Sequence, residues 1–177
     1  SCPKVGVVGE IFLKFNPFAQ KDITTWLIDR GIEVVPPLMT DFFMQSFVNM
    51  KVNQDSHIKK KYIPDFAIDW LYGKVQKQID KINKIGKAFL YFQPFENIYE
   101  KAEKAKQVIS LNTQFGEGWL IAGEMSSFAS QDINHVISLQ PFGCIANHIV
   151  EKGIEKRIKS VYPQINILSL DFDSSVS

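Results

Sequence analysis

Cysteine is scarce in this sequence, and long apolar runs are missing from it. The chain of 177 residues has two cysteines, Cys2 and Cys144. Two cysteines so far apart are too few for a disulfide framework, and the N-terminus lacks the basic and apolar segments of a secretory signal peptide. No apolar run approaches the roughly 20 residues that cross a bilayer, so we expect no membrane association. A reducing cytoplasm is the expected compartment.

An excess of charge of either sign is also absent. The 20 Lys and Arg residues nearly balance the 19 Asp and Glu residues, for a net charge of +1. No overall field therefore draws the molecule to nucleic acid or to an anionic membrane. The lysine run at 59 to 61 has no interleaved aromatic residues and is typical of exposed surface, not of a nucleic-acid site.

A glycine-rich phosphate loop is missing as well. The stretch "GVVGE" follows the first apolar run, but Glu-Ile-Phe stands where a dinucleotide-binding turn needs further glycines. We therefore reject a dinucleotide-binding site at this position.

What the sequence does contain is enough apolar material for a well-filled core. Hydrophobic residues make up 45% of the chain, and 14 of its residues are Phe. A chain of this length suits one compact domain, and we expect residues 1–177 to form a single one.

Short apolar runs predict the strands of a parallel sheet. The run at 4–8 is almost wholly apolar, which is typical of a strand buried on both faces. Further strands are predicted at 32–37, where two prolines stop the run, at 135–140 and at 165–171.

Helical periodicity separates these runs. A helix is predicted around 23–28, a long amphipathic one over 66–85, a charged one over 98–110 and another from about 116. The next is predicted over 144–161. The stripe of the long helix consists of Leu71, Val75, Ile79, Ile82 and Ile85, and that of the last helix of Ile145, Ile149, Ile154 and Ile158. The segment 88–95 is ambiguous between strand and helix, and we interpret it as a helix followed by a loop. We place no function in 38–63.

The order of these elements predicts an α/β fold. We expect a small doubly wound sheet, Rossmann-like or flavodoxin-like, with four parallel strands in the order 2-1-3-4. Helices cover both faces, and a helical insertion separates strands 2 and 3. Ligands of such sheets bind outside the carboxyl ends of the strands, which here selects residues 9–17, 140–148 and 171–174.

Cys144 is the sharpest candidate for chemistry. The turn Pro141-Phe142-Gly143 would leave its thiol near a helix N-terminus, where the helix dipole stabilises a thiolate. The competing interpretation is a buried structural thiol. His148 is four residues further on and could share a metal with Cys144, but we favour a cap or a surface histidine, because no second cysteine lies nearby to complete a zinc site.

Polar residues around the expected crevice form a second candidate set. Glu10 and Asn16 could line the crevice, or could bond the backbone of the turns in which they stand. With Pro141, Gly143 and Asn147 they make up the residues expected to contact a cofactor.

Two pairs of carboxylates are weaker candidates. Glu117 and Glu124 are seven residues apart on one predicted helix, and we interpret them as part of a solvated face. Asp171 and Asp173 could bind a cation, but are interpreted as solubilising residues near the C-terminus.

Three segments resemble a known family. They are "KVGVVGEIFLKFNPFAQKDITTWLIDRGIEVVPP", "GEGWLIAGEM" and "QPFGCIANHIVEKGIEKRIKSVYPQINILSLDFD". They are similar to parts of the large activator-related proteins of the 2-hydroxyacyl-CoA dehydratase and benzoyl-CoA reductase group, also described as CoA-substrate-specific enzyme activases. The resemblance concerns the region that is itself like a dehydratase subunit.

The resemblance implies a place in an ATP-driven electron-transfer system of anaerobic bacteria. In that family an activator with a 4Fe-4S cluster passes an electron to a component with its own cluster, which acts on an acyl-CoA. By resemblance Cys144 is a cluster ligand, whose partner ligands would come from sequence upstream. We expect the chain to be a piece of a longer protein that also has an ATPase region, and to have no turnover or complete cluster by itself.

Two other functions stay open at the level of the sequence. The chain could be a non-catalytic α/β domain that docks other parts of its parent protein, or a domain that binds a small molecule such as an acyl-CoA in the crevice. The sequence does not decide whether the chain is an enzyme, and it names no acyl-CoA.

Overall fold

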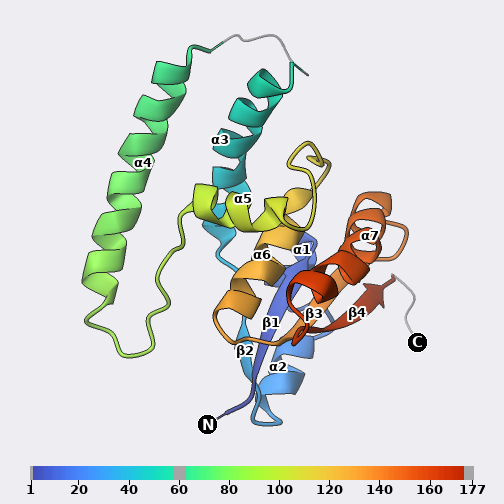
Figure 1. Cartoon of the computed structure of the whole chain (residues 1–177). Helices are drawn as coiled ribbons and strands as arrows, with labels where there is room; N and C mark the ends of the chain where they lie inside the picture. Colours follow the sequence, from blue (N-terminus) through green and yellow to red (C-terminus); the bar gives the residue numbers. More distant parts are fainter. Residues whose placement is uncertain (1, 58–62, 174–177) are drawn as a thin grey trace.

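The computed structural model describes residues 2–57 and 63–173, so the lysine run at 59 to 61 and Ser174 lie outside the described residues. Its centre is a parallel sheet of four strands in the order β2-β1-β3-β4 (Figure 1), which confirms the predicted fold class and strand order. The strands are β1 Lys4–Gly9, β2 Glu33–Val35, β3 His135–Pro141 and β4 Asn166–Phe172.

The helices occupy the connections, as the periodicity predicts. They are α1 Ile11–Phe15, α2 Ile23–Ile28, α3 Met39–Asp55, α4 Asp65–Gly86, α5 Ile98–Lys106, α6 Trp119–Ser130 and α7 Ile145–Val161. The short α1 has no counterpart in the sequence prediction, because five residues are too few to show a helical period. Four of these helices, α3 to α6, form the insertion between β2 and β3.

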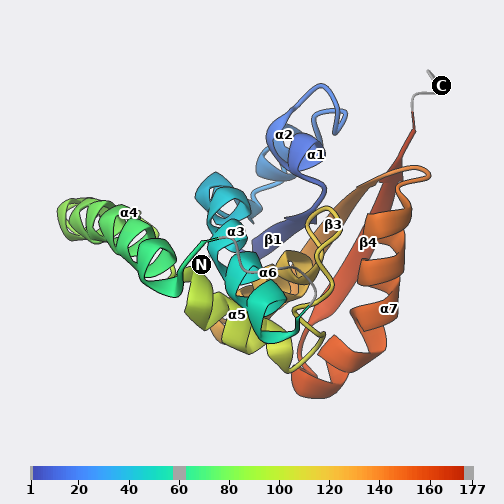
Figure 2. The same ribbon diagram turned by 90° about the horizontal axis from the view of Figure 1, so that it is seen from above.

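Alternating side chains of the strands build two cores, one on each face of the sheet. Val7 packs with Leu13 and Leu27 on the face that α1 and α2 cover. Its neighbour Val8 belongs to the opposite core, with residues of α6 and α7. Figure 2 shows this layering, with α5 outside α6. The two central strands, β1 and β3, are covered on both sides, which explains why their sequences are nearly continuous apolar runs, whereas the edge strand β4 has no fully buried residue.

Helix α6 is buried on every side. All residues from Trp119 to Ala129 are buried, because the helix lies between the sheet and α5. A helix that is enclosed in this way has no solvated face. Any charged residue on it must therefore find a partner inside the protein.

Helix α4 is as long as predicted but is only partly buried. It extends along one side of the molecule (Figure 1), and Ile68 and Ile79 are its buried residues. Of the predicted stripe, Val75 packs on the core, whereas Leu71, Ile82 and Ile85 are exposed. None of the described helices combines the length and the apolarity needed to cross a bilayer.

The segment 88–95 is not helical, so that prediction is wrong. The side chain of Asn83 donates to the carbonyl of Phe95 and accepts from its amide N–H, at 3.0 and 2.8 Å. The ring of Phe92 lies against Gly86, where a Cβ would stand only 2.5 Å from it. These tertiary contacts hold the segment in turns and extended chain, and local periodicity contains no sign of them.

The predicted inward stripe of α7 is wrong at Ile149, which is 66% exposed. The prediction is confirmed at Ile154 and Ile158, which are buried, and Val150 takes the inward position expected for Ile149. A 100° step along a helix is enough to move a side chain from the core to solvent.

Candidate functional site

The carboxyl ends of β1 and β3 lie side by side and bring most of the predicted site residues to one edge of the sheet. Gly9 is paired with Leu139, and the N–H of Glu10 donates to the carbonyl of Leu139 at 3.0 Å. The chain leaves β1 into α1 and leaves β3 into α7. The connections that follow these two strands go to opposite faces of the sheet, which makes this edge the switch point.

Glu10 and Asn16 serve the local backbone here. Glu10 is the N-cap of α1, and its carboxylate accepts from the N–H of Leu13 at 2.9 Å. The side-chain oxygen of Asn16 accepts from the N–H groups of Phe18 and Ala19 at 3.0 and 3.3 Å. Both contacts match the turn-bonding interpretation of these residues.

The turn before α7 places Cys144 at the N-cap of a helix. The carbonyl of Pro141 accepts from the N–H of Cys144 at 3.0 Å, and Gly143 has φ +81°. Cys144 is partly exposed, and its side chain makes no capping hydrogen bond. The 17 residues of α7 begin directly after it.

Asn147 stands three residues after Cys144, in the first turn of α7. It is 1% exposed, and neither its amide nitrogen nor its amide oxygen has a hydrogen-bond partner among the described residues. The side-chain oxygen of Gln140, at the end of β3, is likewise buried and without a described partner. Unpaired buried amides are rare in folded proteins, and a water molecule or a further bound group usually completes their hydrogen bonding.

His148 connects α7 to β4. Its Nδ1 lies 3.0 Å from the carbonyl oxygen of Cys144, and its Nε2 lies 3.0 Å from Oδ1 of Asp171. Both ring nitrogens are therefore engaged with oxygen atoms. The structure places the imidazole as a tether of the helix to the strand that follows it.

A buried carboxylate lies further along the same helix. Glu151 accepts from the amide of Gln140 and from the hydroxyl of Ser169, and burial raises its pKa above the ordinary value. It joins α7 to both β3 and β4. The helix that presents Cys144 is thus held by polar contacts as well as by its apolar face.

The interpretation of Glu117 and Glu124 as a solvated face is wrong. Glu117 is buried and accepts from the N–H of Ile11 at 2.8 Å, which binds the start of α6 to the start of α1. Glu124 is buried in the middle of α6 and pairs with Lys14 through both of its oxygens, at 3.0 and 3.1 Å. The prediction assumed that α6 has one exposed face, whereas the helix is buried on all sides.

Lys14 and Glu124 belong to a larger buried network that the sequence did not reveal. Lys101 of α5 pairs with Asp41 of α3 at 2.5 Å, and all four side chains are almost fully buried. Burial raises the pKa of Glu124, while the nearby ammonium groups of Lys14 and Lys101 act to lower it. A sequence signal did exist for one pair: Lys14 in "IFLKF" and Glu124 in "WLIAGEM" each interrupt an otherwise apolar stretch, whereas Lys101 stands among other charges in "IYEKAEKAK".

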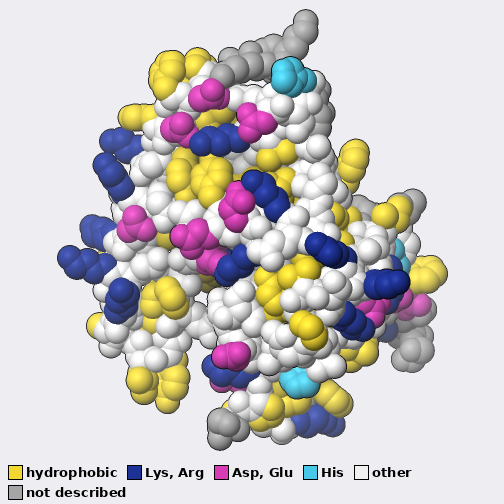
Figure 3. Space-filling model, in the orientation of Figure 1, with side chains coloured by type: hydrophobic (Ala, Val, Ile, Leu, Met, Phe, Trp, Pro, Cys, Tyr) yellow, Lys and Arg dark blue, Asp and Glu magenta, His cyan; other side chains and the backbone are white. Residues whose placement is uncertain are grey.

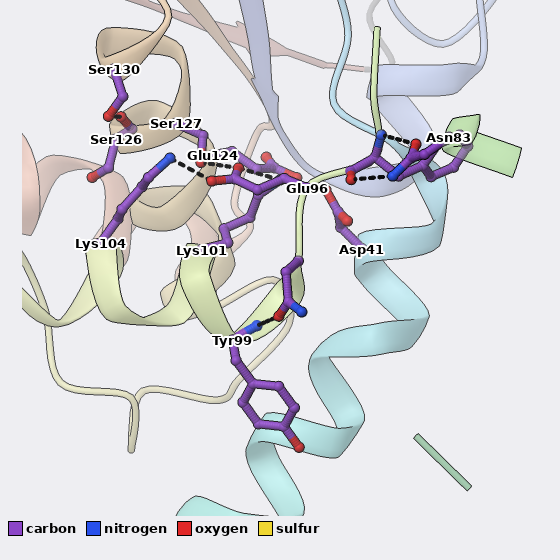
Figure 4. A network of polar contacts seen from close by, with 12 residues as sticks. Asp41, Asn83, Glu96, Tyr99, Lys101, Lys104, Glu124, Ser126, Ser127 and Ser130 are labelled. Carbon is purple, nitrogen blue, oxygen red and sulfur yellow. Dashed lines mark hydrogen bonds and ion pairs between the residues drawn. The ribbon is translucent and has the colours of Figure 1, made fainter. Parts of the chain in front are cut away.

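Glu96 extends the network toward the segment that follows α4. Figure 4 shows it between Lys104 of α5 and Ser127 of α6. Its carboxylate accepts from the Ser127 hydroxyl at 2.6 Å and lies 3.9 Å from the ammonium of Lys101. The network therefore joins α1, α3, α5, α6 and the 87–97 connection.

A cavity of about 1020 Å³ opens beside this network. Its walls are β2 with the residues that follow it, the segment from Phe89 to Glu96 and the end of α6. The cavity reaches Lys4, the first residue of β1, whereas Cys144 follows the last residue of β3. It thus lies away from the carboxyl-edge crevice that the fold rule selected.

The described residues do not by themselves form a metal site. No group of three or more His, Cys, Asp or Glu side chains among residues 2–57 and 63–173 is arranged to hold an ion. Cys2 precedes β1, and its thiol donates to the carbonyl of Gly31 at 2.6 Å. The two cysteines therefore stand at opposite ends of the parallel strands.

Comparisons with family models, curated proteins and solved structures give no match for this chain.

Proposed function

We propose that this chain is a dehydratase-subunit-like domain of a cytoplasmic activator-related protein, in which Cys144 donates one thiolate to an iron-sulfur cluster. One observation carries the proposal: Cys144 is partly exposed at the carboxyl edge of a parallel sheet, at the N-cap of the 17-residue helix α7. A helix N-terminus stabilises a thiolate, which is the form that binds iron. The family resemblance supplies the identity of the metal group.

The surroundings of Cys144 support a bound group at this edge. Asn147 and Gln140 both carry buried amide atoms without a described partner. Of these atoms only the amide nitrogen of Asn147 is a donor, and near a thiolate ligand or a cluster sulfide it would gain the hydrogen bond that it lacks here. Such bonds tune the reduction potential of a cluster.

The chain cannot complete a cluster from its own cysteines. A 4Fe-4S cluster takes three or four thiolates, and the sequence has two cysteines. Because Cys2 lies at the other end of β1, Cys144 is the one thiolate available at this site. The remaining ligands would come from another region of the parent protein, and the acyl-CoA chemistry and ATPase would reside there as well.

Iron content tests the proposal. The parent protein should be reconstituted with iron and sulfide under anaerobic conditions and examined by EPR and iron analysis. Cys144→Ala should reduce or abolish the cluster, while the matched control Cys2→Ala should leave it intact. The 177-residue chain alone should show no stoichiometric 4Fe-4S signal. An unchanged iron content in Cys144→Ala would reject the ligand role.

A second candidate is a docking domain without catalytic function. The observation in its favour is that exposed phenylalanines stand in and beside the loops at the carboxyl edge, namely Phe12, Phe18, Phe115 and Phe142. Large apolar side chains gathered at one edge are typical of a surface that another polypeptide covers. Retention of the cluster in Cys144→Ala, combined with loss of assembly on replacing these phenylalanines, would favour this function.

A further inference from the structure

The cavity beside the buried ion network has the composition of a ligand site. Its volume of about 1020 Å³ is at the upper end of the usual range for small-molecule sites. From its walls and its floor we infer that it binds an organic cation, a primary amine with an aromatic or aliphatic body. This goes beyond the iron-sulfur proposal, since the cavity shares no residue with the Cys144 site.

The walls provide an aromatic surface. They include the side chains of five aromatic residues, Phe89, Tyr91, Phe92, Phe95 and Phe128, and two prolines, Pro36 and Pro37. Phe89 and Tyr91 are 65% and 80% exposed. Figure 3 shows hydrophobic side chains gathered at the lower left, over the connection between α4 and α5. Aromatic faces attract both apolar groups and cations.

Two contacts with α4 position part of the aromatic wall. Asn83 fixes Phe95 through two backbone hydrogen bonds, and Gly86 leaves room for the ring of Phe92. Both anchors lie on the last turns of α4. The segment between them therefore presents its side chains from a fixed frame.

The floor of the cavity offers hydrogen-bond acceptors. Glu96, Glu124 and Ser127 line it, and the Ser127 hydroxyl already donates its proton to Glu96. Lys101 also lines the floor, but its ammonium is paired with Asp41 at 2.5 Å. Carboxylate oxygens can each accept more than one hydrogen bond, so the unused capacity here is mostly acceptor capacity.

The charge of the lining also favours a cationic ligand. Four acidic side chains line the cavity, Glu33, Glu96, Glu124 and Asp132, against two basic ones, Lys4 and Lys101. The cations that pair with Glu96 and Glu124, Lys104 and Lys14, stand outside the lining. Glu33 pairs with Lys4 at 3.1 Å and the Glu124 side chain is 1% exposed, so the floor carboxylate within reach of a ligand is Glu96, whose side chain is 15% exposed. A ligand ammonium would meet its oxygens and the aromatic faces along the wall, whereas a ligand carboxylate would meet like charge there.

Three isosteric probes test the inference on the wild-type chain. They are 3-phenylpropylammonium, 3-phenylpropanol and 3-phenylpropionate, which share one body and differ in charge. Calorimetry and NMR titration near pH 7 should show saturable binding of the amine, at least about tenfold tighter than of the alcohol or the carboxylate. Equal or tighter binding of the carboxylate, or no saturable binding of the amine, would overturn the inference.

Two variants locate the site. Glu96→Gln removes one floor charge and should weaken amine binding about tenfold. The control Glu103→Gln removes an exposed carboxylate of α5 that lies outside the lining, and it should leave amine binding unchanged. Tyr91→Ala should weaken all three probes, while Phe115→Ala, equally exposed but outside the cavity, should weaken none.

The wall variant keeps the test decisive even if Glu96→Gln fails to fold, because Tyr91 is exposed and its loss leaves the core intact. Amine binding that survives Tyr91→Ala unchanged would show that the amine binds elsewhere. Since none of these residues contacts Cys144, the cluster content of the parent protein reports separately on the iron-sulfur proposal.

Discussion

Lys14 of α1 and Glu124 of α6, 110 positions apart in the sequence, form a two-oxygen ion pair that is almost completely buried. The pair connects the carboxyl edge of the sheet with the ion network beside the cavity. Two charges inside a core lose their hydration, and each one then depends on the other for compensation.

Removing one member of this pair should be severely destabilising. Lys14→Met leaves the Glu124 carboxylate buried opposite an apolar side chain, and we expect the free energy of unfolding to fall by about 3–5 kcal/mol. Urea denaturation at pH 7 measures the change. The control Lys159→Met breaks an exposed i,i+4 pair with Glu155 and should change stability by less than about 1 kcal/mol.

A double replacement separates charge from packing. Lys14→Met combined with Glu124→Leu removes both buried charges, and it should recover most of the stability that Lys14→Met loses. A double variant as unstable as the single one would mean that the loss comes from packing and not from the uncompensated carboxylate.

Stability should fall with rising pH through Glu151. Burial raises the pKa of this carboxyl above its ordinary value of 4.5, so the folded state binds its proton more tightly than the unfolded state does. Its contribution is fully present below pH 4.5 and is lost as pH rises through the folded-state pKa. Glu151→Gln should flatten this part of the stability profile relative to the wild type.

Neighbouring charges also affect the pKa of Glu151 and hence the pH dependence of stability. Lys152 lowers the pKa of Glu151, and Glu155 and Asp171 raise it, so the profile should be recorded by urea denaturation at several pH values in constant ionic strength. If wild type and Glu151→Gln have parallel profiles above pH 4.5, the carboxyl does not titrate differently in the folded protein.

Two glycines at the carboxyl edge should respond differently to alanine. At Gly9, with φ +113°, a Cβ would stand 2.1 Å from the carbonyl oxygen of Leu139, so Gly9→Ala should cost about 3 kcal/mol or more. At Gly143, with φ +81°, no atom lies within 4 Å, and only the backbone strain of about 1 kcal/mol remains. Thermal or urea unfolding compares the two, and equal losses would contradict the close approach of β1 and β3.

Asn147 should contribute little to folding. Both of its buried amide atoms lack described partners, so Asn147→Leu should be neutral or slightly stabilising. Asn49 is the matched control, because its side-chain oxygen accepts from the indole N–H of Trp119 at 2.7 Å. Asn49→Leu should lower the free energy of unfolding by about 1–3 kcal/mol. A loss at Asn147 as large as at Asn49 would show that its amide is satisfied within the fold.

Local sequence patterns were sufficient to locate the elements. The four strands, the long helix α4 and the start of α7 at Cys144 are all found where the apolar runs and turn residues predict them. The strand order also follows, since right-handed crossovers leave few arrangements for this chain of elements.

Periodicity failed where contacts between distant residues decide. The segment 88–95 contains enough apolar residues for a helix, yet Asn83 and Gly86 hold it extended. Glu124 has the composition of a surface residue, yet α6 is enclosed on every side, and Lys14 arrives from another part of the chain to pair with it.

The sequence alone determined the parallel sheet and the position of Cys144 at its carboxyl edge, because both depend on patterns within a few residues of one another. Only the tertiary structure decided which charges are buried, which amides at that edge lack partners, and where a cavity opens. Burial and ion pairing arise from helices that meet after more than a hundred residues of chain, as Lys14 and Glu124 do, and no local pattern encodes such a meeting.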